Sequence, residues 1–434
     1  MVKCYTLDGE FYNKGLCLND LKHIYKTVKK NEELLQHFPV DAILFIINEY
    51  SKVISKDKNL LKEEGVPFLS FYLKKSNLEK IIYLNLKNKK YLDNFVDIGN
   101  KKFIKAQKRG LVCHFMSSNV KTLGIYSILQ SIICRNSNLV RLPEGCIDLI
   151  IRLLKPLKNI HIKHKGKTYL GKDLLKNICI VNYPSSNIEL NQFMSEKADC
   201  RVLWGGEDAL NSIRSLQQRT YCKDIIFGPK YSFAVFDKEA IESIQLEKYL
   251  ESLVIDIISF NQTACSSPHV VFLEKSSVSL EEVTQRLIKV FKKLIKRYPL
   301  SLQSEKILAD IINKRGEYAL GLDKMLHCSK GLEYTILIDN DFKLEEPIGG
   351  RTIFLKGIND VFEVKRLITS RVQTVGIAFK NEKRAIDFSD EISKIGVDRV
   401  VKVGYMSFYD SPWDGSLIIS DMVRWCSLNI NGMI

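Results

Sequence analysis

The residue best suited to covalent chemistry in this chain of 434 residues is Cys265, which lies in the polar segment Phe260–Pro268. This segment follows an apolar run and precedes the strand-like residues Val270–Leu273, which predicts a loop held between two rigid elements. A thiol in a polar loop ionises more readily than a thiol in an apolar core, so Cys265 is a candidate nucleophile. His269 is close in sequence, but its place just before a strand favours a structural role over that of a general base.

Two further segments contain groups that bind anions or nucleotides. Ser117, Ser118 and Asn119 lie between an expected strand and an expected helix, where backbone amides and the Asn119 side chain could stabilise an oxyanion or receive part of a nucleotide. A helix cap explains the same residues, and the segment by itself favours that interpretation. Gly205 and Gly206 follow a predicted strand, and such a pair serves either the close approach of a ligand or an ordinary turn.

Several enzyme classes lack support because their motifs are missing from the sequence. There is no GxGxxG fingerprint of a standard Rossmann fold, no GxSxG nucleophile elbow, and neither an HExxH motif nor a CxxC pair, so we predict no metal site. The 11 cysteines are scattered, which does not suit a disulfide framework. No apolar run reaches about 18 residues and the first residues lack a signal-peptide pattern, so we expect a cytoplasmic protein without a membrane span.

The net charge of +15 raises the question of an anionic partner. The lysines and arginines are spread along the chain in short groups beside apolar segments, which is typical of solvated surfaces. The charge therefore does not predict nucleic-acid binding, and it suits an anionic small molecule or an acidic carrier protein equally well.

The elements that must position these residues change in style along the chain. Apolar residues at helical spacing predict an N-terminal helical region. Beyond it, four strand-helix units beginning near Gly110, Asn138, Asn177 and Cys200 predict an α/β layer with a largely parallel sheet. Ligands of such sheets lie at the carboxyl ends of the strands. A second series of strands and helices begins at Asp224, which predicts a second α/β domain.

Taken together, eight short segments resemble the fatty-acyl-CoA reductase family of bacterial bioluminescence, a branch of the aldehyde dehydrogenase superfamily. They occur in the order found in that family, and they are residues 117–120, 136–141, 204–209, 227–230, 262–265, 373–378, 396–399 and 413–415. The resemblance implies an aldehyde-dehydrogenase-like α/β fold, with two parallel-sheet domains and an active site between them. We place the N-terminal helical region at residues 1–95, a dinucleotide-binding domain at 96–232, a catalytic domain at 233–405 and a C-terminal segment at 406–434.

The resemblance also implies roles for individual residues. Cys265 corresponds to the nucleophile of a Gln-x-x-Cys loop, and Asn119 corresponds to the side-chain donor that stabilises the oxyanion. Arg141 corresponds to the basic residue that contacts the adenosine ribose or its phosphate. The remaining positions of the implied cofactor site are Ser117, Ser118, Gly205, Gly206 and Gly228.

Two positions depart from the superfamily pattern. Ile226 stands where members that oxidise aldehydes carry a glutamate that activates hydrolytic water. Loss of that base suits a thioester reductase, whose acyl-enzyme must meet hydride before water. Leu210 stands where the second glycine of the nicotinamide turn is expected, and this change bears on how the dinucleotide lies.

The resemblance therefore predicts NADPH-dependent reduction of an acyl thioester, supplied as acyl-CoA or on an acyl carrier, to an aldehyde through an acyl-cysteine. It also implies a homo-oligomer, and it leaves open a partner enzyme that activates the acyl group. One alternative is an aldehyde dehydrogenase working in the oxidative direction, which needs a water-activating carboxylate near Cys265. The other is a non-catalytic nucleotide-binding protein of the same fold.

Overall fold

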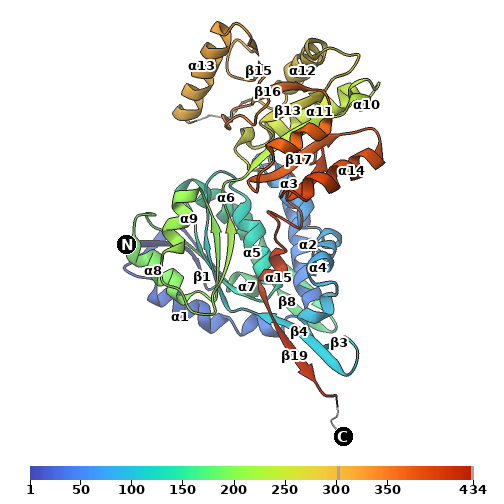
Figure 1. Cartoon of the computed structure of the whole chain (residues 1–434). Coiled ribbons are helices and arrows are strands. Elements are labelled where there is room, and N and C mark those ends of the chain that lie inside the picture. Colours follow the sequence, from blue (N-terminus) through green and yellow to red (C-terminus); the bar gives the residue numbers. More distant parts are fainter. Residues whose placement is uncertain (301–303, 432–434) are drawn as a thin grey trace. The chain divides into compact units, whose positions relative to one another are not determined.

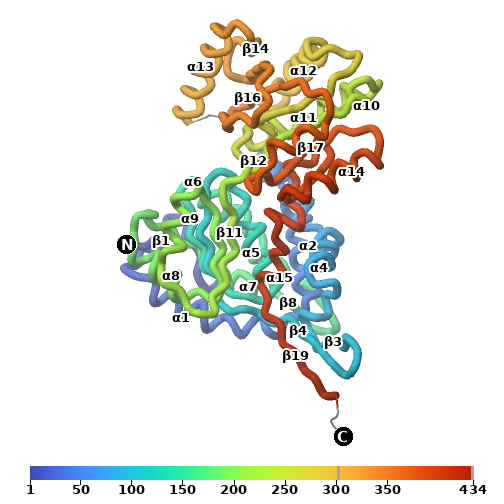
Figure 2. Tube along the Cα trace, viewed as in Figure 1, coloured from blue at the N-terminus to red at the C-terminus, as the bar shows by residue number. Residues whose placement is uncertain are grey.

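The chain forms two compact units in a computed structural model that describes residues 1–300 and 304–431 (Figures 1 and 2). The first unit combines Met1–Gly228 with Tyr409–Ile434, and the second comprises Pro229–Phe408. The chain thus leaves the first unit once and returns to it with its last residues.

The sheet of the first unit has seven strands in the order β11-β10-β5-β6-β9-β1-β2. Five of them are parallel: β5 (Leu111–Phe115), β6 (Ser137–Arg141), β9 (Ile178–Asn182), β10 (Cys200–Trp204) and β11 (Lys223–Phe227). The helices that follow the first four are α5 (Leu123–Ile133), α6 (Glu144–Leu154), α8 (Ile188–Lys197) and α9 (Glu207–Arg214). The four strand-helix units that the sequence predicts are therefore confirmed.

The N-terminal region differs from the prediction over its first residues. Its helices α1 (Lys22–Asn31), α2 (Val40–Lys56), α3 (Val66–Tyr72) and α4 (Lys75–Leu86) follow a hairpin of β1 (Val2–Leu7) and β2 (Glu10–Leu18), which joins the edge of the sheet through β9. Asp8 and Gly9 both have positive φ, 52° and 75°. An Asp-Gly pair of this kind closes a two-residue hairpin turn, and this signal outweighs the helical pattern that begins only after it.

The sheet of the second unit also has seven strands, in the order β14-β15-β16-β13-β12-β17-β18. All but β14 (Met325–Cys328) are parallel to their neighbours: β12 (Tyr231–Phe236), β13 (Val270–Glu274), β15 (Thr335–Ile338), β16 (Thr352–Ile358), β17 (Val372–Ala378) and β18 (Arg399–Lys402). Alternate residues of the central strands enter two different apolar clusters, which contain α11 (Leu246–Ile258) and α12 (Leu280–Leu294) on one face and residues of α13 (Glu305–Leu320) and α14 (Glu382–Ser393) on the other.

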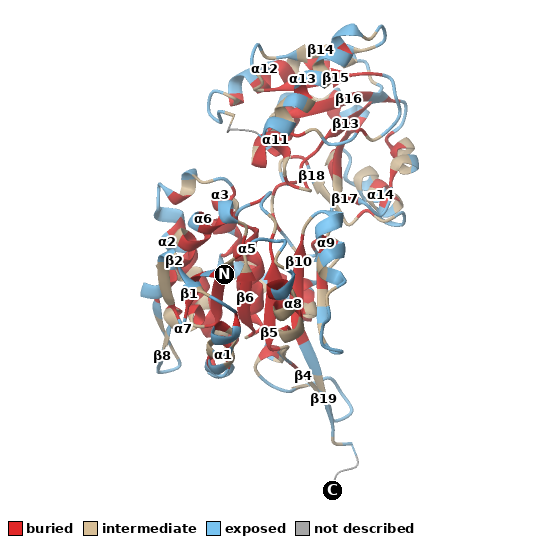
Figure 3. Cartoon of the chain, turned by 90° about the vertical axis from the view of Figure 1, so that its left-hand side faces the viewer, coloured by how far each residue is buried: buried red, intermediate tan, exposed pale blue. Residues whose placement is uncertain are grey.

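Buried residues fill the central strands of both sheets, as the red segments of Figure 3 show. Strands covered by helices on both faces become near-continuous apolar runs, which is the pattern of a parallel sheet. A small separate sheet in the first unit has the order β19-β4-β3, in which β4 (Lys102–Lys108) pairs with both β19 (Val423–Asn429) and β3 (Val96–Asp97). Within the described residues, none of the helices has the length and apolar character needed to cross a bilayer.

A titratable side chain, that of His114, is buried inside the first unit. His114 of β5 is fully buried, and its two ring nitrogens lie 2.9 Å from Ser127 Oγ and 2.9 Å from Asn138 Oδ1. Burial lowers the pKa of His114 from 6.5 to about 4, because the charged imidazolium would lose its hydration. The ring is therefore neutral near pH 7.

This arrangement predicts that acid weakens the first unit through His114. In the unfolded chain His114 binds a proton near pH 6.5, whereas in the folded chain it does so only near pH 4. The contribution of neutral His114 to the free energy of unfolding is therefore intact above pH 6.5 and is lost as the pH falls toward 4. The loss amounts to at most about 3 kcal/mol. Urea unfolding at pH 7 and pH 4.5 should show a smaller drop for His114→Gln than for the unmodified protein. Replacement of the exposed His161 by Gln should leave the drop unchanged, and equal drops in all three proteins would contradict the prediction.

Candidate active site

Cys265 lies in the connection from α11 to β13, at the amino ends of the central strands of the second sheet. Three consecutive residues before it have left-handed backbone conformations: Phe260 (φ 54°), Asn261 (φ 45°) and Gln262 (φ 61°). Each such residue costs about 1–2 kcal/mol when it is not glycine. A strained turn of this length persists only where its surroundings hold it in place.

A second left-handed turn holds the first. Gly349, Gly350 and Arg351 have φ values of 82°, 58° and 62°, and the Gly350 amide donates to the carbonyl of Asn261 at 3.0 Å. Arg351, only 2% exposed, donates from Nε to Asn261 Oδ1 at 3.1 Å. Its other nitrogens donate to the carbonyls of Tyr298 and Pro299 at 2.9 and 3.1 Å. The guanidinium therefore links the Asn261 side chain of the cysteine loop to the backbone of the segment that follows α12.

The side chain of Gln262 closes the loop from the other direction. Its Nε2 donates to the carbonyls of Pro268 and Thr352, at 2.8 and 2.9 Å. The first bond ties the two ends of the cysteine loop together, and the second ties the loop to β16. Cys265 is half-buried, and both ends of its loop are held by hydrogen bonds.

Two side chains contact Cys265 directly from neighbouring strands. Ser232 of β12 donates its hydroxyl to the Cys265 carbonyl at 2.7 Å. Gln373 of β17 donates from Nε2 to the Cys265 sulfur at 3.1 Å. The backbone and the sulfur of the candidate nucleophile are thus held from two adjacent strands.

His269 does not provide a cationic partner for this thiol. The residue is 5% exposed, its ring centroid lies 5.7 Å from that of Tyr231, and its Nδ1 is buried without a hydrogen bond. Burial lowers the pKa of His269 to about 4, so the ring is uncharged at neutral pH. This supports the structural role that the sequence favours.

We predict that the Arg351 fork is needed to keep the cysteine loop in its strained conformation. Arg351→Lys retains the charge but loses the planar set of donors, so several buried carbonyl and amide oxygens lose their partner. The free energy of unfolding should fall by about 2–3 kcal/mol, as measured by urea denaturation. Arg366→Lys, at an exposed position of the same unit, should change it by less than about 0.5 kcal/mol. An Arg351→Lys protein as stable as the control would show that the fork does not hold the loop.

The other predicted residues lie in the first unit, at the carboxyl edge of its sheet. Asn119 follows β5 and is exposed, and Ser117 Oγ donates to its Oδ1 at 2.7 Å. Helix α5 begins after Thr122 without a side-chain cap, so these residues do not form the helix cap that the sequence favours. Because Asn119 Oδ1 is an acceptor here, an anionic ligand would meet the Nδ2 end of its carboxamide.

The candidate cofactor residues come together at the same edge. In the order β11-β10-β5-β6, Leu203 lies beside Phe115, Phe115 beside Arg141, and Trp204 beside Phe227. The residues that follow or end these four strands are Gly228, Gly205, Gly206, Ser117, Ser118 and Arg141. The edge of a parallel sheet thus gathers them although they are spread over 112 positions of the sequence, from 117 to 228.

Buried donors at this edge suit a nucleotide. Arg141 Nε is buried without a hydrogen bond, while its Nη2 donates to the Tyr183 carbonyl at 3.3 Å. The indole nitrogen of Trp204 is also buried without a partner. Gly206 directly precedes α9, and a side chain added to it would meet no atom within 4 Å, so the space beside this turn is open. Donors without a partner and an open helix start, both at the carboxyl edge of one sheet, suit the ribose and phosphate groups of a dinucleotide.

The two departures from the superfamily pattern have clear positions. Leu210 is inside α9 and 8% exposed, in the apolar cluster that packs on the first sheet, so it belongs to the core rather than to the turn. Ile226 on the edge strand β11 is 37% exposed, and an apolar side chain there cannot take a proton from water. Gly206 has an ordinary φ of −71°, so its backbone does not require glycine.

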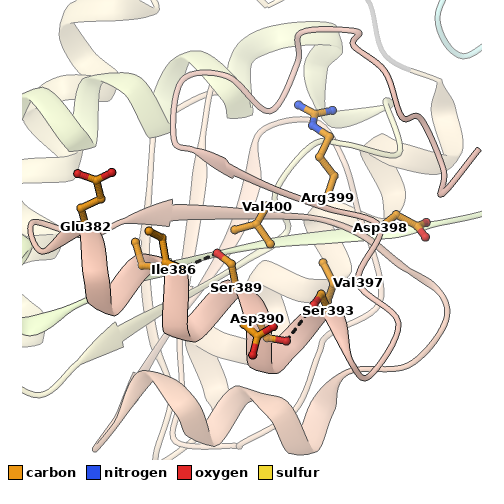
Figure 4. A pocket seen from close by; sticks show the side chains of 10 residues that line it. Glu382, Ile386, Ser389, Asp390, Ser393, Val397, Asp398, Arg399 and Val400 are labelled. Carbon is orange, nitrogen blue, oxygen red and sulfur yellow. Dashed lines mark hydrogen bonds between the residues drawn. The ribbon is translucent and has the colours of Figure 1, made fainter. Parts of the chain in front are cut away.

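Two other features of the second unit are less suited to catalysis. Asp339, Asp341 and Glu345 form an acidic cluster, but Lys356 Nζ lies 2.6 Å from Asp339 Oδ1 and 3.0 Å from Glu345 Oε1, so an ammonium group already pairs with two of the three carboxylates. A surface pocket of about 470 Å³ lies between α14 and β18 (Figure 4). Its Ser389 and Ser393 hydroxyls donate to carbonyls of their own helix.

The two sheets define the chain as a protein of the aldehyde dehydrogenase fold, which confirms the predicted fold class. Aldehyde dehydrogenase C from Pseudomonas syringae, solved as a mutant with NAD⁺ and octanal, superposes with a TM-score of 0.68 and 10% identity over 100% of this chain and 94% of that one. Glyceraldehyde-3-phosphate dehydrogenase from Methanocaldococcus jannaschii, solved with NADP, gives 0.65 and 13% identity, over 99% and 98%. At such identities the likeness concerns the fold alone.

The family model of acyl-CoA reductase (LuxC) matches residues 35–425, and the chain belongs to this family. It is similar to the long-chain acyl-protein thioester reductases of Vibrio harveyi, with 25% identity over 77% of this chain and 67% of that protein, and of Aliivibrio fischeri, with 22% over 77% and 66%. The chain spans about two thirds of the length of these relatives.

Proposed function

We propose that this protein reduces an acyl thioester to an aldehyde through an acyl group carried on Cys265. The observation that supports the proposal most directly is the half-buried sulfur of Cys265, held by a strained turn and hydrogen-bonded by the Gln373 carboxamide. A thiol that serves only in packing needs neither feature. Membership of the acyl-CoA reductase family, whose similar members are named long-chain acyl-protein thioester reductases, supplies the substrate class.

In the proposed first step the Cys265 thiolate attacks the carbonyl carbon of the thioester. A new carbon–sulfur bond forms, the oxygen takes the negative charge, and collapse of this intermediate expels the carrier thiol as its thiolate. The Cys265 backbone amide and the Asn119 carboxamide are the proposed donors to the oxyanion, as the family resemblance implies. The product of this step is an acyl-enzyme and a free carrier thiol.

NADPH is the proposed cofactor, with Ser117, Ser118, Arg141, Gly205, Gly206 and Gly228 as its binding residues. A bound reduced nicotinamide supplies the hydride that converts the acyl group to an aldehyde. In this proposal the residues at the carboxyl edge of the first sheet bind and orient the dinucleotide, and Arg141, whose Nε is buried without a hydrogen bond, receives the extra phosphate. Ile226 leaves water without a base at its position, which favours reduction over hydrolysis of the acyl-enzyme.

The oxidative alternative needs a carboxylate that activates water, and the apolar Ile226 counts against it.

We also propose a homo-oligomer in the manner of the superfamily, with acyl-CoA, an acyl carrier protein or an acyl-activating enzyme as the source of the acyl group.

The central prediction concerns a single covalent adduct. Incubation with a fatty acyl-CoA or a fatty acyl carrier protein, without nicotinamide, should add one acyl group to the protein in intact-mass spectrometry. Cys265→Ser should form no acyl adduct that NADPH can convert to aldehyde, because an unactivated hydroxyl is a poor nucleophile. Its rate of aldehyde formation should fall by at least about 99% for the same reason. Replacement of Cys328, an exposed cysteine of the same unit, by Ser should retain both.

The outcomes of this experiment separate the candidate functions. An adduct that yields aldehyde on addition of NADPH supports the reductase. An adduct that yields only fatty acid would favour the hydrolytic chemistry of an aldehyde dehydrogenase. Absence of any adduct, with either carrier and with several chain lengths, would favour the non-catalytic nucleotide-binding alternative.

A second prediction tests Arg141 as the partner of the extra phosphate. Arg141→Met should weaken binding of adenosine 2′,5′-bisphosphate, measured by calorimetry, by roughly 10–100-fold, because a charge-assisted hydrogen bond is lost. The KM for NADPH should rise in parallel, while the KM for NADH should change less than about 3-fold by the same reasoning. Arg424→Met, at an exposed position of β19, serves as the control. Equal weakening toward both nucleotides would remove Arg141 from phosphate recognition.

A further inference from the structure

Gln373 belongs to a segment, residues 373–378, that carries the family resemblance but to which the sequence assigns no role. The structure places it at the start of β17, 1% exposed, with Nε2 donating to Cys265 Sγ at 3.1 Å. It comes from a position 108 residues beyond the cysteine. A buried carboxamide that meets the candidate nucleophile is a candidate for part of the chemistry.

The pairing of β17 with β12 is irregular at Gln373, and this irregularity affects the direction of the Gln373 side chain. Tyr231 of β12 pairs with Val372, but the next residue, Ser232, pairs with Thr374. Gln373 is therefore the extra residue of a β-bulge on β17. Bulges redirect a side chain that regular alternation would point elsewhere, and they occur often beside active sites.

The hydrogen bonds around the carboxamide fix which end faces the sulfur. Thr374 Oγ1 donates to Gln373 Oε1 at 3.3 Å, so the oxygen end is an acceptor toward Thr374 and the NH2 end faces Cys265. The Thr374 backbone amide donates to Ser232 Oγ at 3.2 Å, and Ser232 donates in turn to the Cys265 carbonyl. One small network thus sets the carboxamide and the cysteine together.

A donor at this position favours one protonation state of the thiol. A neutral thiol is a weak acceptor, whereas a thiolate is a charged acceptor and forms the stronger, charge-assisted bond. The bond is also stronger in a buried site than in water. Since His269 is neutral at physiological pH, its ring contributes no competing positive charge.

We infer that the Gln373 carboxamide is the donor that stabilises the Cys265 thiolate and aims its sulfur at the substrate. The inference rests on the proposed function only in taking Cys265 as the nucleophile. Gln373 acts at two points of that reaction: it stabilises the attacking thiolate, and it stabilises the same thiolate again when the carbon–sulfur bond breaks and the aldehyde leaves. In the acyl-enzyme between them the sulfur carries no charge and the bond is weaker.

The test measures the ionisation of Cys265 directly. Alkylation by iodoacetamide is followed across pH 5 to 10, with peptide mass spectrometry to separate Cys265 from the other cysteines. Gln373→Met keeps the length of the side chain but removes the donor, and it should raise the apparent pKa of Cys265 by about one unit and slow alkylation at pH 7 about 10-fold. Gln373→Glu keeps the shape and adds a negative charge, so it should raise this pKa further.

Two matched variants serve as controls. Gln245→Met, at an exposed position of the same unit, should leave the alkylation profile unchanged. Thr374→Val removes the hydroxyl that orients the carboxamide, and it should cause a smaller shift in the same direction as Gln373→Met. Thermal unfolding of each variant separates a shift in ionisation from a loss of fold, because a purely structural role would lower the unfolding temperature without moving the alkylation profile.

The results distinguish this inference from the proposed function. An unchanged profile in Gln373→Met and Gln373→Glu proteins that remain folded would overturn the role of Gln373, even if Cys265 still accepts an acyl group. If the profile shifts as expected but the unmodified protein takes no acyl group from any thioester, Gln373 tunes this thiol and the reductase proposal fails.

Discussion

The arrangement around Cys265 depends on two left-handed turns that face each other at the base of one loop. Residues 260–262 and 349–351 all have positive φ, and four of these six residues are not glycine. Such conformations are unfavourable for each of those residues, so the turn exists because Arg351, the Gly350 amide and the Gln262 side chain satisfy the backbone and side-chain groups that it leaves inside the protein. Buried hydrogen bonds offset the conformational cost of these turns, and they hold the loop that carries the Cys265 sulfur.

The two sheets contribute opposite edges to the proposed chemistry. In the first unit the candidate residues follow parallel strands at their carboxyl ends, where helix starts and open turns suit phosphate and ribose. In the second unit Cys265, Ser232 and Gln373 lie at the amino ends of three adjacent strands, where a bulge and a strained turn bring side chains from separate segments into contact. The proposed nucleotide site and the candidate nucleophile thus depend on different structural features of one chain.

The side chains of Gln373 and His269 in the second unit, and that of Ile226 in the first, bear on the proposed acyl transfer. Gln373 provides a donor but no base, burial lowers the pKa of His269 to about 4 and so makes its ring a weak base, and Ile226 has an apolar side chain. Gln373 and Ile226 cannot take a proton from water, and His269 with its low pKa is a poor general base at neutral pH. The lack of a strong base among these groups suits the proposed thioester reductase, whose acyl-enzyme must meet hydride before water.

The sequence by itself determined the class of fold and singled out Cys265 as the candidate nucleophile. Strand and helix periodicity is local, so the strand-helix units around β5, β6, β9 and β10 could be predicted, and the polar loop of Cys265 stands out for the same reason. The hairpin at Asp8 and Gly9 was also within reach of sequence reasoning, because an Asp-Gly pair is a local turn signal. Gln373 and Arg351 were not, since each acts on residues about 90 to 110 positions away through contacts that only the folded sheet creates. Tertiary structure alone decided them: a β-bulge and a left-handed turn leave no periodic trace in the sequence, yet they determine where these side chains point.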